Sequence, residues 1–186
     1  MKLTVLRLGH RVGRDIRITT HVGLVARALG ADEIVLSGQY DKGIINTLTD
    51  VAERWGGPFR VHYERNWLSF LKRKKEEGCE VIHLTVYGLP IGDAVKALRR
   101  SKRDKVVVVG SERVPSILYG LADWNVAVGS QPHSEVGALA VFLDRFFKGG
   151  ELSKEFHGWM LKVVPQKRGK RVMKITETAS CRGSGK

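Results

Sequence analysis

Apolar positions along the chain change their period repeatedly, and each change marks a predicted strand or helix. Short alternating or continuous apolar runs, bounded by Gly, Pro or polar turns, predict strands at residues 2–7, 32–37, 59–63, 80–87, 106–109 and 124–128. Apolar residues at three- and four-residue steps predict helices at 22–29, 41–55, 67–77, 93–101 and 116–121, and a last helix through residue 147. This alternation predicts an α/β fold with a six-stranded, mainly parallel sheet and helices on both faces.

Local signals mark the ends of several helices. Thr19 or Thr20 is expected to cap the first helix, and Asp41 is expected to open the second. Pro132 is expected in the first turn of the last helix, where a missing N–H is tolerated. Along that helix an apolar stripe predicts a face buried in the core or in an interface between subunits: Val136, Leu139, Ala140, Leu143, Phe146 and Phe147.

The strands at 106–109 and 124–128 each run into a polar turn that begins with glycine, at 110–115 and at 129–135. Ligands of parallel sheets bind outside the carboxyl ends of the strands, so these turns predict a pocket. Gly110 and Gly129 let the backbone approach a ligand closely. Glu112 and Glu135 disfavour a phosphate and favour a cationic centre such as a sulfonium or an amine. The alternative is that both glutamates only cap helices.

The pattern changes again beyond residue 150. Two alternating segments, 162–166 and 171–177, flank a polar turn and predict a β-hairpin. Residues 162–186 contain eight Lys or Arg and one Glu, so the hairpin is basic. We therefore expect a main α/β domain at 1–150, a C-terminal helix and β-hairpin extension at 151–178, and a disordered tail at 179–186.

Composition adds a clue to the partner. The 186 residues suffice for one core and are short for two full domains. The sequence contains thirty-two Lys and Arg and nineteen Asp and Glu, which gives a formal net charge of +13. This excess indicates a polyanionic partner, most of all a nucleic acid. The sequence shows neither a leader nor a membrane-spanning run, so a cytoplasmic location without membrane contact is expected.

Several common sites do not match the sequence. Gly9 and Gly13 are spaced differently from the Gly-x-Gly-x-x-Gly turn of dinucleotide folds, and no Walker loop follows a strand. The six histidines lack the spacing of metal ligands, so no metal is expected. Cys79 and Cys181 are either two reduced thiols or a bond that joins the tail to the body.

The order of the motifs resembles the SPOUT class of RNA methyltransferases. The motifs are a Gly-x-x-x-Arg helix at 23–27, Val-Val-Gly-Ser-Glu-Arg at 108–113, and a strand that feeds Gly-Ser-Gln-Pro-His-Ser at 129–134. More closely, Leu-Gly-His-Arg at 8–11, Arg-Asp-x-Arg-x-Thr-Thr-His at 14–21 and Ala-Arg-Ala-x-Gly-Ala at 26–31 resemble the archaeal tRNA (cytidine-56)-2′-O-methyltransferases. The resemblance extends over residues 3–175.

The resemblance implies a C-terminal trefoil knot in the sheet, a homodimer, and S-adenosylmethionine as the cofactor. It also implies methyl transfer to the ribose 2′-hydroxyl of a T-loop cytidine of tRNA, C56. A catalytically silent, basic RNA-binding module of the same fold is the alternative. Carried onto this chain, the resemblance places the cofactor against the end of the fourth strand and the two polar turns: Leu84, Gly110, Ser111, Glu112, Arg113, Val114, Val128, Gly129, Ser130, Gln131, Pro132, His133, Ser134 and Glu135.

The resemblance further implies an arginine of the first motif close to the reacting hydroxyl. Arg17, Arg14 and Arg27 are the candidates. Relatives carry an Asn six residues before this arginine, whereas His21 stands six residues before Arg27. Alignment from the preceding loop instead favours Arg17 or Arg14, and Arg17 is preferred narrowly. Since the pKa of arginine exceeds about 12, the guanidinium is a poor proton acceptor. Its expected role is to orient the phosphate and stabilise the developing alkoxide, which leaves the general base open.

Overall fold

The structure is a computed structural model that describes residues 1–110 and 114–175. Three of the residues expected at the cofactor, Ser111, Glu112 and Arg113, lie outside this part of the chain. Cys181 and the tail expected at 179–186 lie outside it as well.

A six-stranded parallel sheet forms the centre of the molecule, with the strand order β3-β2-β1-β5-β4-β6. Val5 of β1 pairs with Ile34 of β2 on one side and with Val107 of β5 on the other. The predicted α/β fold is thus confirmed. The strands are β1 (Leu3–His10), β2 (Glu33–Gly38), β3 (Arg60–Tyr63), β4 (Glu80–Pro90), β5 (Lys105–Val109) and β6 (Trp124–Ala127).

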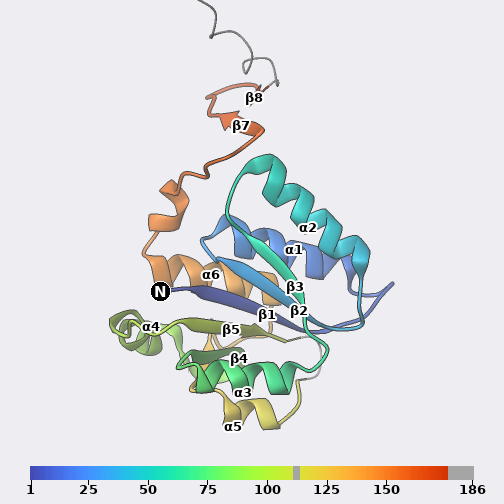
Figure 1. Ribbon diagram of the computed structural model, residues 1–186. Helices are drawn as coiled ribbons and strands as arrows, with labels where there is room; N and C mark the ends of the chain where they lie inside the picture. Colours follow the sequence, from blue (N-terminus) through green and yellow to red (C-terminus); the bar gives the residue numbers. More distant parts are fainter. Residues whose placement is uncertain (111–113, 176–186) are drawn as a thin grey trace, which may run out of the picture.

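Helices cover both faces of this sheet (Figure 1). One apolar cluster joins the sheet to α1, α2, α4 and α6, and a second joins the other face to α3 and α5. The predicted stripe on the last helix faces the first cluster, where its members Leu139 and Leu143 are fully buried, together with Phe142, which the prediction did not include. The helices are α1 (Ile16–Ala28), α2 (Lys42–Trp55), α3 (Trp67–Glu76), α4 (Ile91–Arg100), α5 (Ile117–Leu121) and α6 (Glu135–Phe147).

The start of α1 differs from the prediction. The helix begins at Ile16, so Thr19 and Thr20 lie inside it and do not cap it. Thr20 Oγ1 donates to the carbonyl oxygen of Ile16 at 2.8 Å, as a helical hydroxyl does. Four of the five residues at 16–20 are β-branched, which lowers the helix propensity and so concealed this first turn. The correction moves Arg17 from the expected loop into the helix.

The start of α6 also differs. Pro132 lies in the loop before the helix, not in its first turn. The side chain of Ser134 caps the helix instead, because its hydroxyl accepts a hydrogen bond from the backbone N–H of Gly137 at 3.1 Å. In contrast, the expected cap of α2 is confirmed, since the Asp41 carboxylate accepts from the N–H of Ile44 at 3.2 Å.

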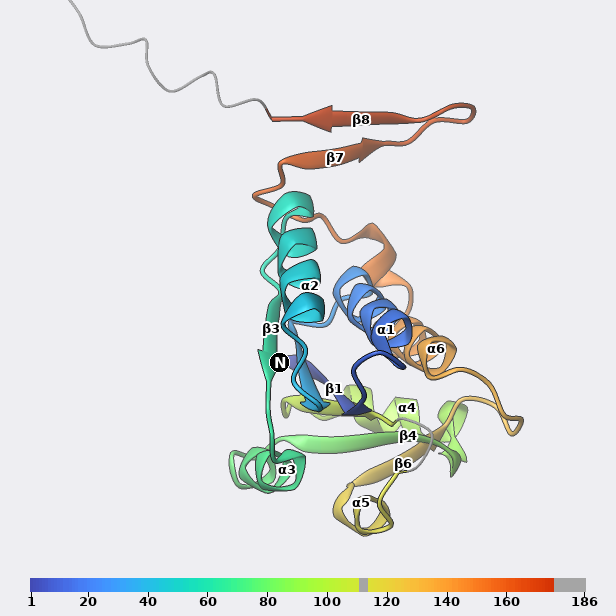
Figure 2. The same ribbon diagram turned by 90° about the vertical axis from the view of Figure 1, so that its right-hand side faces the viewer.

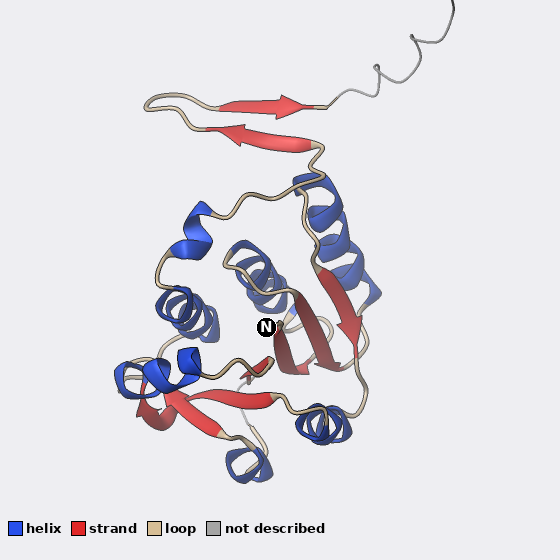
Figure 3. Ribbon diagram, turned by 60° about the vertical axis from the view of Figure 1, so that its left-hand side comes forward, coloured by secondary structure: helices blue, strands red, loops and turns tan. Residues whose placement is uncertain are grey.

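After α6 the chain forms a short 3₁₀ helix, η1 (Gly150–Ser153), and then an antiparallel pair of strands, β7 (Leu161–Val164) and β8 (Arg171–Lys174). Backbone hydrogen bonds attach this segment to the end of α2: Gly57 N–H donates to His157 O at 3.0 Å, and Met160 N–H donates to Arg54 O at 2.9 Å. The two strands stand apart from the main sheet, beyond the end of α2 (Figures 2 and 3).

Among the described residues, no helix combines the length and the apolar character that crossing a membrane requires. Their His, Cys, Asp and Glu side chains form no group of three that could hold a metal ion. Cys79 is a buried thiol whose pKa is raised by burial.

Candidate active site

A cavity of about 360 Å³ opens at the carboxyl ends of β4, β5 and β6, where the sequence predicted a pocket. Its volume falls within the range of small-molecule sites. Of the residues expected at the cofactor, seven line it: Leu84, Gly110, Val114, Val128, Pro132, His133 and Glu135. Gly129, Ser130, Gln131 and Ser134 belong to the same loop but not to the cavity wall.

One wall of the cavity is an excursion of β4 that the sequence did not reveal. Both Leu84 and Leu89 pair with Val126 of β6, so residues 85–88 leave the ladder between them. Thr85, Val86 and Tyr87 line the cavity from this excursion. The strand was predicted to end at Tyr87, whereas it resumes beyond the excursion and ends at Pro90.

Gly88 allows the excursion to return to the sheet. A Cβ atom at this position would overlap the backbone of Asn125 and Val126 in β6. Only glycine therefore fits without moving one of the two strands. This close approach keeps β4 and β6 paired on both sides of the excursion.

His83 also lines the cavity and was not identified by the sequence analysis. Its Nδ1 lies 2.9 Å from Asn125 Oδ1, and Asn125 Nδ2 donates to Tyr119 O at 2.9 Å. The ring packs edge to face with Tyr119 at 4.8 Å between centroids. Burial lowers the pKa of His83, opposed by the hydrogen bond to Asn125. The imidazole is therefore neutral at pH 7, with Nδ1 as the donor to Asn125.

Arg7 ties the two polar turns of the cavity to the sheet. It extends from β1 with 1% of its surface exposed. Its Nη1 donates to the carbonyl oxygen of Gly110, and its Nη2 forms an ion pair of 3.2 Å with Glu135 Oε1. Nε adds a 3.4 Å hydrogen bond to Thr19 of α1. Burial lowers the pKa of Arg7 and Glu135 raises it, yet a guanidinium keeps its charge in proteins.

His133 contacts the backbone at both ends of the second polar turn. The two ring nitrogens of His133 face the carbonyl oxygen of Ser134, at 3.0 Å, and that of Val128. The imidazole thus lies between the two ends of the loop that connects β6 and α6. This contact holds Val128 and Pro132 at the rim of the cavity.

The residues around the cavity suit an elongated ligand with a positive centre. Leu84, Val114 and Val128 give it apolar walls. Glu135 contributes a carboxylate whose side chain is 30% exposed, although Arg7 offsets part of its charge. S-adenosylmethionine combines apolar parts with a sulfonium, so this set of groups fits it.

The three candidate arginines fall into two places. Arg14 and Arg17 are exposed, in the turn before α1 and in its first turn, while Arg27 lies in the last turn. Ten residues separate Arg17 from Arg27, which corresponds to about 15 Å along a helix. Arg27 is buried, and its Nη2 donates to Gly56 O at 2.5 Å. Among the described residues that line the cavity, none is one of these arginines.

Comparison with solved structures supports the fold. The AdoMet-bound rRNA methyltransferase from Sinorhizobium meliloti superimposes with a TM-score of 0.58 at 15% sequence identity, covering 80% of this chain and 56% of that chain. A sequence identity this low supports a common fold and nothing further.

Comparison with relatives goes further. The chain is 56% identical over 173 residues to a tRNA (cytidine(56)-2′-O)-methyltransferase of Methanothrix thermoacetophila, which covers 93% of this chain and 98% of the relative. It is 51% identical over 176 residues to the Thermococcus kodakarensis protein of the same name, with coverages of 93% and 97%. The family described as tRNA ribose 2′-O-methyltransferase, aTrm56, matches residues 55–173. The chain therefore belongs to the aTrm56 family of tRNA ribose 2′-O-methyltransferases.

Proposed function

We propose that the chain transfers a methyl group from S-adenosylmethionine to the ribose 2′-hydroxyl of cytidine 56 in the T-loop of tRNA. The observation that carries this proposal is the identity of 51% and 56%, over 93% of the chain, to relatives named for that reaction. The net charge of +13 supports a polyanionic substrate.

The cofactor is proposed to bind in the cavity at the ends of β4, β5 and β6. When bound, it supplies a methyl group on a positively charged sulfur. The apolar walls at Leu84, Val114 and Val128 would hold its uncharged parts, and the Glu135 carboxylate favours the positive centre. The proposed site includes Ser111, Glu112 and Arg113 in the turn after β5, as the family resemblance implies.

Arg17 is proposed as the arginine that orients the RNA phosphate and stabilises the developing alkoxide, with Arg14 as the second choice. Arg17 is exposed in the first turn of α1 and is absent from the cavity wall of its own chain. We therefore propose a homodimer in which the start of α1 in one subunit faces the cavity of the other. Arg27 is the weakest of the three candidates, because its guanidinium is buried at the far end of the helix.

We propose three further properties of the chain, of which the first is implied by the family resemblance. The strand order β5-β4-β6 makes the chain cross β4 between β5 and β6, which is compatible with a trefoil knot in this half of the sheet. The extension at 151–178 is proposed as a separate, basic RNA-contacting unit beside the main domain at 1–150. A tRNA substrate is consistent with a cytoplasmic location.

Transfer of labelled methyl from S-adenosylmethionine to an unmodified tRNA transcript, with mapping of the product nucleotide, tests the function. The wild-type chain is expected to yield a single ribose-methylated cytidine at position 56. Arg17→Ala is expected to reduce the turnover number by roughly 100-fold or more, since an electrostatic contact to the reacting oxygen typically supplies that much. Arg27→Ala tests the buried third candidate and is expected to keep the turnover number at saturating tRNA, with urea denaturation checking that the variant is folded.

Three results would contradict parts of this proposal. Methylation of another nucleotide would refute the substrate position, and loss of turnover in Arg27→Ala with full activity in Arg17→Ala would reverse the arginine assignment. Salt-dependent binding of tRNA without any methyl transfer would favour the catalytically silent RNA-binding module instead.

A further inference from the structure

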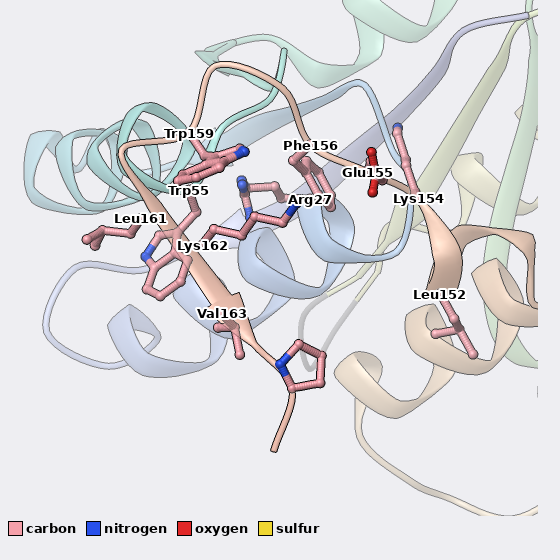
Figure 4. A pocket seen from close by; sticks show the side chains of 11 residues that line it. Arg27, Trp55, Leu152, Lys154, Glu155, Phe156, Trp159, Leu161, Lys162 and Val163 are labelled. Carbon is pink, nitrogen blue, oxygen red and sulfur yellow. The ribbon is translucent and has the colours of Figure 1, made fainter. Parts of the chain in front are cut away.

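A second cavity, of about 490 Å³, lies away from the active site, where the ends of α1 and α2 meet the C-terminal extension (Figure 4). Three half-buried aromatic side chains line it: Trp55 from the end of α2, and Phe156 and Trp159 from the extension. Leu161 and Val163 of β7 complete its apolar surface. Because α1 and α2 end at the edge of the sheet opposite to the carboxyl ends of the strands, this cavity is separate from the cofactor site.

Cations lie over the aromatic rings of this cavity. The guanidinium carbon of Arg27 stands 4.6 Å from the centre of the Phe156 ring, and Lys154 Nζ stands 5.8 Å from it. Lys162 Nζ lies 5.5 Å from the centre of the Trp159 ring. Figure 4 shows Lys162 extending toward Phe156 and Arg27. Glu155 is the one acid among the described residues that line the cavity.

The guanidinium of Arg27 is fixed by one hydrogen bond but keeps a buried N–H donor without a partner among the described residues. Its Nη2 binds the carbonyl oxygen of Gly56, while its buried Nε finds no hydrogen-bond partner among the described residues. Burial lowers the pKa of this guanidinium. Burying a cation with an unpaired hydrogen-bond donor costs free energy in a purely structural site. An electron-rich ligand beside the guanidinium would offset this cost.

We propose that this cavity, the aromatic pocket, binds an unpaired nucleotide of the tRNA substrate outside the target base. The proposal rests on the proposed function. The base stacks on the rings of Trp159 and Phe156, as unpaired bases do in RNA-binding proteins. Lys154 and Lys162, both exposed, neutralise the flanking phosphates.

The combination of groups favours RNA over other occupants. Phe156 and Trp159 each have a cation beside the ring, and stacked bases tolerate such cations while their phosphates require them. The turn between β7 and β8, together with β8 itself, carries five more basic residues, which continue the positive surface away from the pocket: Lys167, Arg168, Lys170, Arg171 and Lys174.

Equilibrium binding of an unmodified tRNA transcript to the full-length variants at several salt concentrations tests the proposal. Trp159→Ala is expected to lower the affinity by roughly 5- to 100-fold with an unchanged salt slope, because it removes stacking and no charge. Trp159→Phe is expected to restore most of the affinity. Lys162→Ala is expected to reduce the slope of log K against log salt by about one, because it removes one phosphate contact.

Trp67→Ala is the matched control, since Trp67 is a half-buried tryptophan of α3 on the other face of the sheet. Its affinity is expected to stay within twofold of wild type. Sedimentation of each variant tests whether a second copy of the chain fills the pocket. Wild-type affinity in Trp159→Ala, or a loss of affinity that follows a loss of the dimer, would overturn the proposal.

Methyl transfer separates this proposal from the proposed function. Trp159→Ala is expected to raise the KM for tRNA and to leave the turnover number and the affinity for S-adenosylmethionine unchanged. A wild-type chain that binds tRNA through Trp159 but transfers no methyl would refute the function and keep the aromatic pocket. A chain that methylates tRNA with an unchanged KM in Trp159→Ala would do the reverse.

Discussion

Arg7 shows how one buried charge can position a whole site. Its guanidinium contacts the turn after β5, the start of α6 and the side of α1, so three elements share a single donor group. Both polar turns of the proposed cofactor site are thereby fixed to β1. An alternating strand with Lys2 and Arg7 at its ends would be expected to expose these charges, which is why the sequence did not identify Arg7.

Replacing Arg7 with methionine keeps most of the side-chain volume and removes these bonds. We expect Arg7→Met to lower the free energy of unfolding by about 2–4 kcal/mol, because Glu135 and the carbonyl oxygen of Gly110 lose their buried partner. Binding of S-adenosylmethionine is expected to weaken as well. Urea denaturation and titration calorimetry measure the two effects.

Arg54→Met serves as the control for Arg7→Met. Arg54 forms an exposed ion pair with Asp50, so its loss is expected to cost less than about 1 kcal/mol. An Arg7→Met variant as stable as this control would show that the buried contacts contribute little.

His83 gives the stability a pH dependence. Its pKa lies below the ordinary value of 6.5 because the ring is buried in the folded chain. As the pH falls below about 6.5, the unfolded chain therefore binds a proton that the folded chain does not, and the free energy of unfolding decreases. We expect His83→Gln to flatten this part of the curve in urea denaturation between about pH 7.5 and about pH 5.

The sequence predicted the part of the cavity wall that follows a glycine-containing turn. It did not predict the part formed by β4, where the strand leaves the sheet. Gly110 and the loop at 129–135 could be identified from their turn-forming residues. Seven of the residues expected at the cofactor do line one cavity. His83 sits within an apolar strand, where a lone histidine resembles an ordinary core residue. Its partner Asn125 belongs to another strand, and only the pairing of β4 with β6 brings them together.

At the scale of elements, the excursion of β4 depends on one residue. We expect Gly88→Ala to destabilise the chain by about 1–3 kcal/mol or more, because the added methyl group would overlap the backbone of β6. Gly92→Ala, in the first turn of α4, has no neighbouring described atom within 4 Å of the added carbon. It is expected to stabilise the chain by up to about 1 kcal/mol. Thermal unfolding of both variants would show whether opposite signs are found.

Helix and strand order followed directly from periodicity, while the ends of the elements did not. Both errors at helix starts have a local cause: the β-branched residues before Thr20 resemble a strand, and Pro132 competes with Ser134 as a start signal. The return of β4 at Leu89 depends on Val126, which comes much later in the chain. Such long-range pairing leaves no periodic trace in the strand itself.

At the scale of the whole molecule, the charge is unevenly placed. Neutralising Lys167, Arg168 and Lys170 between β7 and β8 is expected to weaken tRNA binding and to flatten its salt dependence, by about one unit of slope for each phosphate that these side chains neutralise. The same change of charge at three exposed lysines elsewhere is the control and is expected to have a smaller effect: Lys72 in α3, Lys96 in α4 and Lys102 just after α4. Equal effects in the two triple variants would mean that the positive field acts as a whole.

The length of α1 has a consequence for substrate choice. The helix carries Arg17 in its first turn and Arg27 in its last, so a rigid rod of about 15 Å separates the group proposed to face the ribose from the aromatic pocket. Such a protein would select its substrate by the distance between two of its nucleotides. A short linear oligonucleotide with the correct sequence would contact either Arg17 or the aromatic pocket. A folded RNA that presents two unpaired nucleotides at the right separation would contact both.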